Sequence, residues 1–166
     1  PPLKLHLEPT SHCNLRCVMC PQSIGATRGN GHMDLGLYRK IIDEAKGFTT
    51  SITLAVTGES LLHPQFVEMV NYAERNGISV ILNTNATLLK QEMTDQLLDA
   101  GISYISFACD GFTKDMYEQA RRGADFEKTK ENILCFLRRK KERGLRKPYT
   151  VLSILKLGLG TCTEAE

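Results

Sequence analysis

Five short apolar segments alternate along the chain with longer segments whose apolar residues recur at helical spacing. The strand-like segments cover residues 3–8, 52–56, 78–82, 102–109 and 149–155, and a glycine separates each helix-like segment from the next strand-like one. This repeated order predicts a parallel sheet with right-handed crossover connections. Such a sheet is either an open doubly wound layer or a barrel, and both place active sites at the carboxyl ends of their strands.

The helix-like segments are predicted from their periodicity and from the residues at their ends. They run over about 35–45, 64–73, 93–98 and 126–144, each with apolar residues on one face. Asp34 precedes the first of these segments and suits an N-cap. Each helix is therefore expected to pack one apolar stripe against the sheet.

The faces of the strand-like segments favour a barrel or half-barrel. In the second segment one face is aliphatic, with Ile52, Leu54 and Val56. The other face carries Thr53, Ala55 and Thr57. Strands covered by helices on both faces read as nearly continuous apolar runs. One aliphatic face and one small or polar face instead predict helices on one side and a roomy interior on the other. We therefore expect an α/β barrel or half-barrel with a cavity for a sizeable ligand.

The composition is that of an ordinary globular domain. Hydrophobic residues make up 42% and charged residues 24% of the 166 residues, which excludes a disordered tail, a collagen-like chain and a coiled coil. No apolar run approaches the roughly 20 residues of a membrane span. The net charge of +2 does not by itself imply nucleic acid, and the basic run 138–147 lacks interleaved aromatic residues. No membrane partner is therefore expected, and the basic run is interpreted as a solvated helix end rather than as a nucleic-acid surface.

Six cysteines are the unusual feature of this composition. A chain of this length can build a core without disulfide staples, and no signal peptide is evident, so we expect thiols in the cytoplasm. Cys109 and Cys135 lie in apolar runs and are interpreted as core residues. Cys162, near the C-terminus, receives no role.

The other three cysteines form one group on the loop that follows the first strand. Cys13, Cys17 and Cys20 are spaced by four and three residues, which allows one compact loop to wrap a metal centre. A [4Fe–4S] cluster in an electron-transfer protein takes four thiolates, so three leave one iron free to bind another molecule. The alternative is a zinc site completed by His12, although structural zinc sites usually pair their ligands in two separated clips.

The spacing Cys13-x3-Cys17-x2-Cys20 after a strand resembles the signature loop of the radical S-adenosylmethionine (radical SAM) enzymes. The resemblance implies that the three cysteines hold a [4Fe–4S] cluster and act in catalysis. The free iron would bind the amino and carboxylate groups of S-adenosylmethionine. Reduction would then cleave this cofactor to methionine and a 5′-deoxyadenosyl radical, which abstracts hydrogen from the substrate. An electron donor such as flavodoxin or ferredoxin is implied as well.

Further segments carry the likeness along most of the chain. Thr57-Gly58-Glu59-Ser60 is similar to the family's Gly-Gly-Glu-Pro segment, which meets the methionine amino group, and Thr84-Asn85-Ala86 resembles its Thr-Asn-Gly. Cys109-Asp110-Gly111 looks like the end of Ser-Leu-Asp-Gly, and Arg121-Arg122-Gly123 resembles the Arg-x-Gly-x-x-Phe stretch, whose arginine meets the cofactor carboxylate in some branches. The resemblance implies cofactor contacts from Thr57, Gly58, Glu59, Asn85, Ser106, Asp110 and Arg122.

Several positions depart from the family pattern. Thr57 replaces a glycine and Ser60 a proline, which changes the freedom of that loop. Ala86 also replaces a glycine. Ala108 stands where many members have the serine that touches the ribose, and Ser106 on the same face is its expected substitute.

The resemblance implies a partial (β/α)6 TIM-like barrel, of which the sequence shows five strands. Residues 1–166 are therefore predicted to be a radical SAM core domain without its sixth strand and without any auxiliary-cluster domain. The segments 17–21 and 31–34 are closest in wording to the branch with C-terminal SPASM/twitch auxiliary-cluster domains. A peptide or small-molecule substrate is expected. Modification of RNA or of a cofactor precursor is a second hypothesis, and a non-catalytic zinc-binding interaction module is a third.

Overall fold

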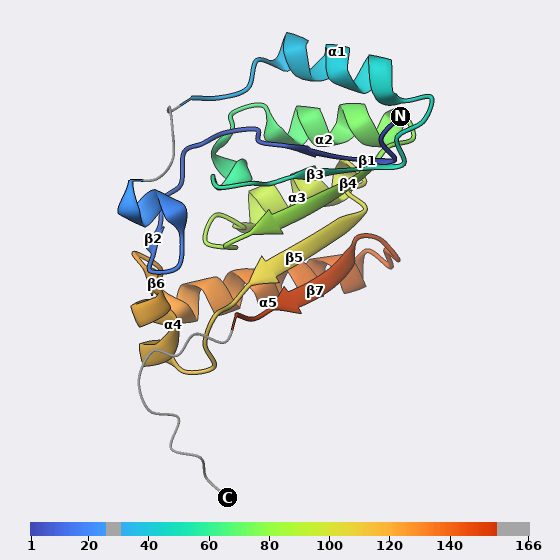
Figure 1. The fold of residues 1–166 in the computed structure, drawn as a ribbon. Coiled ribbons are helices and arrows are strands. Elements are labelled where there is room, and N and C mark those ends of the chain that lie inside the picture. The colour runs from blue at the N-terminus through green and yellow to red at the C-terminus, as the bar shows by residue number, and fades with distance from the viewer. Residues whose placement is uncertain (26–30, 156–166) are drawn as a thin grey trace, which may run out of the picture.

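A parallel sheet of five strands forms the centre of the computed structural model, which describes residues 1–25 and 31–155 (Figure 1). The strands are β1 (Lys4–Leu7), β3 (Ser51–Leu54), β4 (Ser79–Thr84), β5 (Tyr104–Ala108) and β7 (Tyr149–Ser153). They lie side by side in that order, and each neighbouring pair is parallel. The predicted α/β class and all five predicted strands are confirmed.

Four helices connect consecutive strands of this sheet. They are α1 (Leu35–Ala45), α2 (Phe66–Arg75), α3 (Gln91–Asp99) and α5 (Phe126–Glu142), and each contacts the next along the chain. The strand order follows the chain order, so right-handed crossovers place all four helices on one face of the sheet. A doubly wound sheet reverses its strand order part-way, and this sheet does not. The barrel-type alternative of the prediction is therefore the correct one.

The aliphatic faces of the strands form the core beneath these helices. Leu54, Val80, Leu82, Ile105 and Phe107 are at most 2% exposed. Burial of such side chains supplies most of the favourable free energy of folding. The hydrophobic effect therefore fixes which face of each strand meets the helices.

The opposite faces are small or polar, as the alternation predicted. They carry Thr53 on β3, Asn83 on β4 and Ser106 on β5, and Asn83 is exposed. Val56 was expected on the aliphatic face, and this prediction is wrong. It lies beyond the end of β3 at Leu54 and is 61% exposed.

The ends of the helices follow the expected local chemistry. Asp34 caps α1, because its side-chain oxygen accepts a hydrogen bond of 2.8 Å from the Leu37 amide. Gly77 and Gly101 follow α2 and α3 with φ values of +77° and +75°. A left-handed residue of this kind ends a helix, and glycine adopts it at low cost.

Five short elements were not predicted. They are β2 (Arg16–Cys17), the 3₁₀ turns η1 (Pro21–Ile24) and η2 (Ser60–Leu62), α4 (Lys114–Ala120) and β6 (Arg121–Arg122). β2 and β6 pair with each other in antiparallel orientation, far apart in the sequence. Two-residue strands have too little periodicity to be recognised from sequence.

The remaining cysteines lie differently from the prediction. Cys109 and Cys135 are half-buried rather than core residues, and both are free thiols. Cys162 lies outside the described residues. Within residues 1–25 and 31–155, no helix combines the length and the apolar character that crossing a membrane requires.

We predict that Leu82→Ala lowers the free energy of unfolding by about 2–5 kcal/mol, because the substitution leaves a cavity in the sealed core. Leu152→Ala on β7 is the matched control, since Leu152 is 50% exposed. Urea unfolding followed by circular dichroism measures both. Equal losses in the two variants would contradict this description of the core.

Candidate active site

A cavity of about 240 Å³ lies at the carboxyl ends of the strands. In Figure 1 the arrowheads point toward this side of the sheet, where β2 and β6 lie. The wall of the cavity is built from the loop after β1 that carries Cys13, Cys17 and Cys20 (the cysteine loop), from the segments that follow β3 and β4, and from the end of β5. The lining residues are Cys13, Cys17, Met19, Cys20, Ala55, Val56, Thr57, Gly58, Glu59, Asn83, Thr84, Asn85, Ala108 and Arg121.

The cysteine loop is anchored on one side by β6. Arg16 and Cys17 pair with Arg122 and Arg121, respectively. Next to this pair the Val18 amide donates to the Ala120 carbonyl over 2.9 Å. These backbone bonds hold Cys17, which is only 8% exposed, at the cavity wall.

The same loop is anchored on another side by the turn after β4. The Asn85 side-chain amide donates to Oδ1 of Asn14 over 3.0 Å, and the Asn14 amide donates to the Thr87 hydroxyl over 2.8 Å. Asn14 was not among the predicted site residues. The available sequence signal was its position next to Cys13 in the predicted ligand loop.

The backbone of the cysteine loop also packs directly on Gly58. A Cβ atom at Gly58 would lie 1.9 Å from the Thr10 carbonyl oxygen and 2.9 Å from that of His12. The neighbouring Glu59 amide donates to the same His12 carbonyl over 2.8 Å. Only glycine permits this approach, so the predicted importance of Gly58 has a steric cause.

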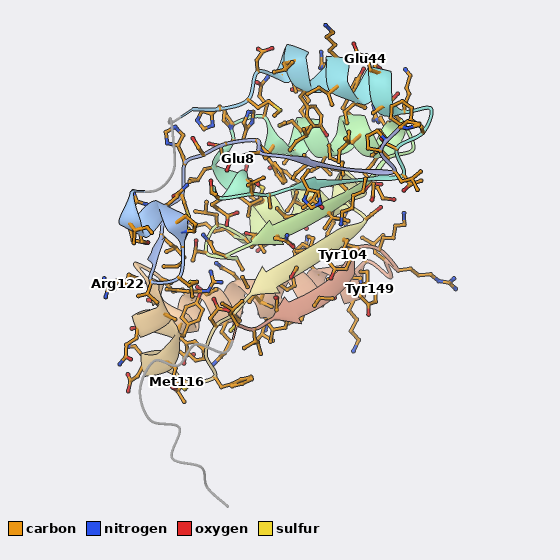
Figure 2. The ribbon with its side chains drawn as sticks, viewed as in Figure 1. Glu8, Glu44, Tyr104, Met116, Arg122 and Tyr149 are labelled. Carbon is orange, nitrogen blue, oxygen red and sulfur yellow. The ribbon has the colours of Figure 1, made fainter. Side chains whose placement is uncertain are left out.

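Glu8, the residue after β1 (Figure 2), holds the segment after β3. One of its carboxylate oxygens accepts hydrogen bonds from the Thr57 amide over 2.8 Å, from the Gly58 amide over 3.2 Å and from the Thr57 hydroxyl. The hydroxyl bond exists because Thr57 stands where the family pattern has glycine. This departure therefore adds a contact to Glu8.

Glu59 is a buried carboxylate in the cavity wall, with an exposure of 3%. It accepts hydrogen bonds of 2.8 Å from the Thr84 hydroxyl and from the Asn85 amide, and one of 3.3 Å from the Leu61 amide. Burial raises the pKa of Glu59, while these hydrogen bonds act in the opposite direction. The carboxylate is therefore fixed in direction, and its negative charge is costly in the absence of a cation.

The turn after β4 contains a strained residue. Ala86, which replaces a glycine of the family pattern, has a φ of +61° and is fully buried. For a non-glycine residue this left-handed conformation costs free energy. The Ala86 amide donates to the Thr84 hydroxyl over 3.1 Å, which helps to hold the turn that carries Asn85.

The structure brings Arg121 into the cavity wall and leaves Arg122 outside it. Arg121 is 9% exposed, and its Nη2 forms an ion pair of 2.6 Å with Asp110. Arg122 is exposed and lies at the outer edge of the molecule (Figure 2). Successive strand residues point to opposite sides, and here Arg121 lines the cavity whereas Arg122, the arginine named by the prediction, does not.

Two other predicted contacts also lie off the cavity. Ser106 is buried within β5, and Ala108 is the β5 residue that lines the cavity. Asp110 reaches the site through its ion pair with Arg121 and also accepts a hydrogen bond of 2.8 Å from the Leu155 amide. The cavity thus contains all three cysteines together with Thr57, Gly58, Glu59 and Asn85 from the predicted set.

The thiols and charges of the cavity define its possible chemistry. Burial raises the pKa of Cys13 and of Cys17, and the guanidinium of Arg121 partly offsets the effect at Cys17. Among the described residues, no three His, Cys, Asp or Glu side chains converge closely enough to hold one metal ion. A cluster differs from a single ion, because its thiolates bind separate irons. Three thiols around one cavity are a suitable donor set for such a centre.

His12, the fourth ligand of the alternative zinc site, does not line this cavity. Its ring lies 4.9 Å from the ring of His32, and His32 in turn lies 5.2 Å from His63, measured between centroids. His63 is buried, and its Nε2 lies 2.9 Å from the Met33 carbonyl oxygen. His12 therefore packs in a group of three histidines, none of which lines the cavity.

Two features define the class of the protein: a partial barrel of parallel strands with its helices on one face, and three cysteines on the loop after the first strand. The model of the family described as the Radical SAM superfamily matches residues 7–155. The chain belongs to this superfamily, whose members are enzymes that use a [4Fe–4S] cluster and S-adenosylmethionine. This assignment confirms the resemblance stated above. It disfavours the third hypothesis, a non-catalytic zinc-binding interaction module.

The curated relatives are longer proteins. The tungsten-containing aldehyde ferredoxin oxidoreductase cofactor-modifying protein of Pyrococcus furiosus is 38% identical over 108 residues, which cover 64% of this chain and 30% of the relative. The AdoMet-dependent heme synthase of Methanosarcina barkeri is 32% identical over 128 residues, which cover 76% and 36%. The chain thus spans about a third of the length of these curated relatives.

Solved structures share the fold at low sequence identity. Native anSMEcpe with bound AdoMet matches with a TM-score of 0.71 and 22% identity, over 93% of this chain and 43% of that one. Streptococcus suis SuiB bound to S-adenosylmethionine matches with a TM-score of 0.75 and 18% identity, over 96% and 35%. Both matches confirm the partial-barrel fold.

Gly58→Ala is predicted to lower the free energy of unfolding by about 3 kcal/mol, because backbone atoms of the cysteine loop must move to admit the methyl group. Gly47→Ala is the matched control, since a Cβ at Gly47 meets nothing within 4 Å. Thermal unfolding of both variants measures the difference. A Gly58→Ala variant as stable as Gly47→Ala would disprove the close packing.

The raised pKa of Glu59 predicts a dependence of stability on pH. The contribution of Glu59 to the free energy of unfolding is complete below its ordinary pKa of 4.5. It is lost as the pH rises through the higher pKa that Glu59 has in the folded protein. The stability of the cluster-free protein relative to Glu59→Gln therefore falls as the pH rises above 4.5, by about 1.4 kcal/mol for each pH unit that separates the folded from the unfolded pKa.

Urea unfolding at several pH values measures this difference. Glu44→Gln on α1 is the control for removing one negative charge, because Glu44 is exposed (Figure 2). If the free energy of unfolding of the wild type, relative to that of Glu59→Gln, rose with pH instead, the prediction would be wrong.

Proposed function

We propose that this chain is the catalytic core of a radical SAM enzyme that starts hydrogen abstraction from a peptide or small-molecule substrate. One observation carries the proposal: three thiols of a single loop, a buried carboxylate and a buried guanidinium line the same cavity. The cavity lies at the carboxyl ends of the strands, where barrel enzymes keep their active sites. Membership of the superfamily supports the same reaction class.

In this proposal Cys13, Cys17 and Cys20 hold the [4Fe–4S] cluster. Thiolates are the usual ligands of such clusters, and the anchored loop presents all three at one wall. When bound, the cluster and S-adenosylmethionine supply the reductive cleavage that yields methionine and the 5′-deoxyadenosyl radical. The protein contributes the position of the cofactor and the charges around it.

Two charged side chains suit the two ends of an amino acid group. Glu59 places a buried carboxylate where it can attract the methionine ammonium, and Thr57 and Gly58 shape the adjoining segment. Arg121 has a buried Nε that, within the described part of the chain, finds no hydrogen-bond partner. An unpaired donor in a cavity wall is costly, and a cofactor carboxylate would satisfy it.

The other predicted contacts take different roles in this proposal. Asn85 lines the cavity and also ties the cysteine loop to β4. Asp110 acts through Arg121, which it orients. Ser106 and Arg122 are given no contact with the cofactor, since neither lines the cavity.

The substrate class rests on the relatives. The heme synthase and the cofactor-modifying protein support a second candidate, modification of a cofactor precursor, whereas the mycofactocin maturase MftC of Mycobacterium tuberculosis, 29% identical over 126 residues, supports the first. We also propose a flavodoxin or ferredoxin as electron donor and a cytoplasmic location, which suits free thiols. A sixth strand and a C-terminal auxiliary-cluster domain stay predictions.

The test is the anaerobic formation of 5′-deoxyadenosine. The protein that carries this chain is reconstituted with iron and sulfide, reduced with dithionite and supplied with S-adenosylmethionine. Cys17→Ala is expected to abolish product, because the cluster loses a ligand. Cys135→Ala, a half-buried thiol on α5, is the matched control and is expected to keep activity.

The same samples also test the cofactor itself. Undiminished 5′-deoxyadenosine from Cys17→Ala would contradict the proposed cluster ligands. Tight binding of zinc without iron–sulfur absorption would contradict the proposed function as a whole.

A further inference from the structure

The guanidinium of Arg121 contacts both the sulfur of a proposed cluster ligand, Cys17, and the carboxylate of Asp110. Its Nη1 donates a hydrogen bond to Sγ of Cys17 over 3.9 Å, and its Nη2 forms the ion pair of 2.6 Å with Asp110. Nε is the third donor of the same planar group and lies buried without a partner among the described residues. One cation thus touches a thiol of the cysteine loop from inside the cavity wall.

The position of this cation is tightly fixed. The backbone of Arg121 pairs with that of Cys17 in the β2–β6 ribbon, so the donor and the sulfur are held by the same pair of strands. The side chains of Arg121 and Asp110 are 11% and 5% exposed, which limits screening of the charge by water. Asp110 is held in turn by the Leu155 amide.

Arg122 provides a natural comparison on the same two-residue strand. It carries the same charge and pairs with Arg16, but it is exposed at the outer edge of the molecule (Figure 2). A charge in water acts weakly on a buried group, whereas a buried charge in contact acts strongly. The two arginines therefore separate the effect of contact from that of net charge.

We propose that Arg121 raises the reduction potential of the cluster held by Cys13, Cys17 and Cys20, through its hydrogen bond to the Cys17 sulfur. The inference rests on the proposed function. Reduction adds one negative charge to the cluster, and part of this charge resides on the thiolate sulfurs. A cation that donates an N–H to one of these sulfurs stabilises the reduced form more than the oxidised form. Arg121 is in this respect a positioning residue that acts through Cys17.

The redox step itself is simple. One electron passes from an external reductant, dithionite in the test, to the cluster, and no bond to Cys17 forms or breaks. The ion pair with Asp110 opposes the effect of Arg121, but Asp110 contacts Nη2, whereas Cys17 contacts Nη1. The cation is therefore in direct contact with the sulfur, and the anion is not.

The experiment is a redox titration of the reconstituted protein in the absence of S-adenosylmethionine, followed by electron paramagnetic resonance. Arg121→Gln is expected to lower the midpoint potential by about 59 mV relative to Arg122→Gln, which corresponds to a tenfold loss of the reduced form at a given potential. Arg122→Gln removes the same charge and is expected to stay near wild type. Circular dichroism and the iron content of each variant check fold and cluster assembly.

Equal midpoint potentials in Arg121→Gln and Arg122→Gln would overturn the proposal. If Arg121→Gln assembles no cluster, Arg121→Lys replaces it in the comparison, because lysine keeps the charge but lacks the fork that spans Cys17 and Asp110. Its potential is then expected below that of Arg122→Gln, and an equal value overturns the proposal. A wild-type protein that forms no iron–sulfur centre would instead refute the proposed function, so the two failures are distinguishable.

Discussion

The close packing of the cysteine loop on Gly58 is the contact on which the rest of the site depends. The carbonyl groups of Thr10 and His12 lie where a side chain at Gly58 would stand, and the His12 carbonyl also accepts a hydrogen bond from Glu59. The end of β1 and the end of β3 are thereby joined through backbone atoms. Backbone contacts of this kind fix positions more narrowly than long side chains do. The thiols and the carboxylate therefore face the same cavity.

Two charged side chains lie buried in the cavity wall, Glu59 and Arg121. The charge of Arg121 is paired with Asp110, but its Nε has no hydrogen-bond partner among the described residues. Burial of a charge costs free energy unless an opposite charge or hydrogen bonds compensate for it. In the proposed function, the ammonium group of S-adenosylmethionine supplies a counter-charge for Glu59, and its carboxylate supplies an acceptor for Nε of Arg121.

The fold could largely be predicted because its signals are local and repeated. Each helix has its own periodicity, and Asp34 and Gly77 mark helix ends by chemistry that acts within a few residues. The face pattern of the strands was also readable, since aliphatic and polar residues alternate. The end of β3 was predicted two residues too late, because Val56 continues the alternation after the pairing has ended.

The site was only partly predictable, for a different physical reason. The sequence alone determined the class of the fold, the loop with Cys13, Cys17 and Cys20, and the segment around Glu59, because these are contiguous motifs that follow strands. Only the tertiary structure decided between Arg121 and Arg122. The two arginines are adjacent residues of the same type, and the pairing of β6 with the distant β2 determines which guanidinium turns inward. Long-range pairing of two-residue strands leaves no periodic trace in the chain, so it is settled only when the whole barrel has folded.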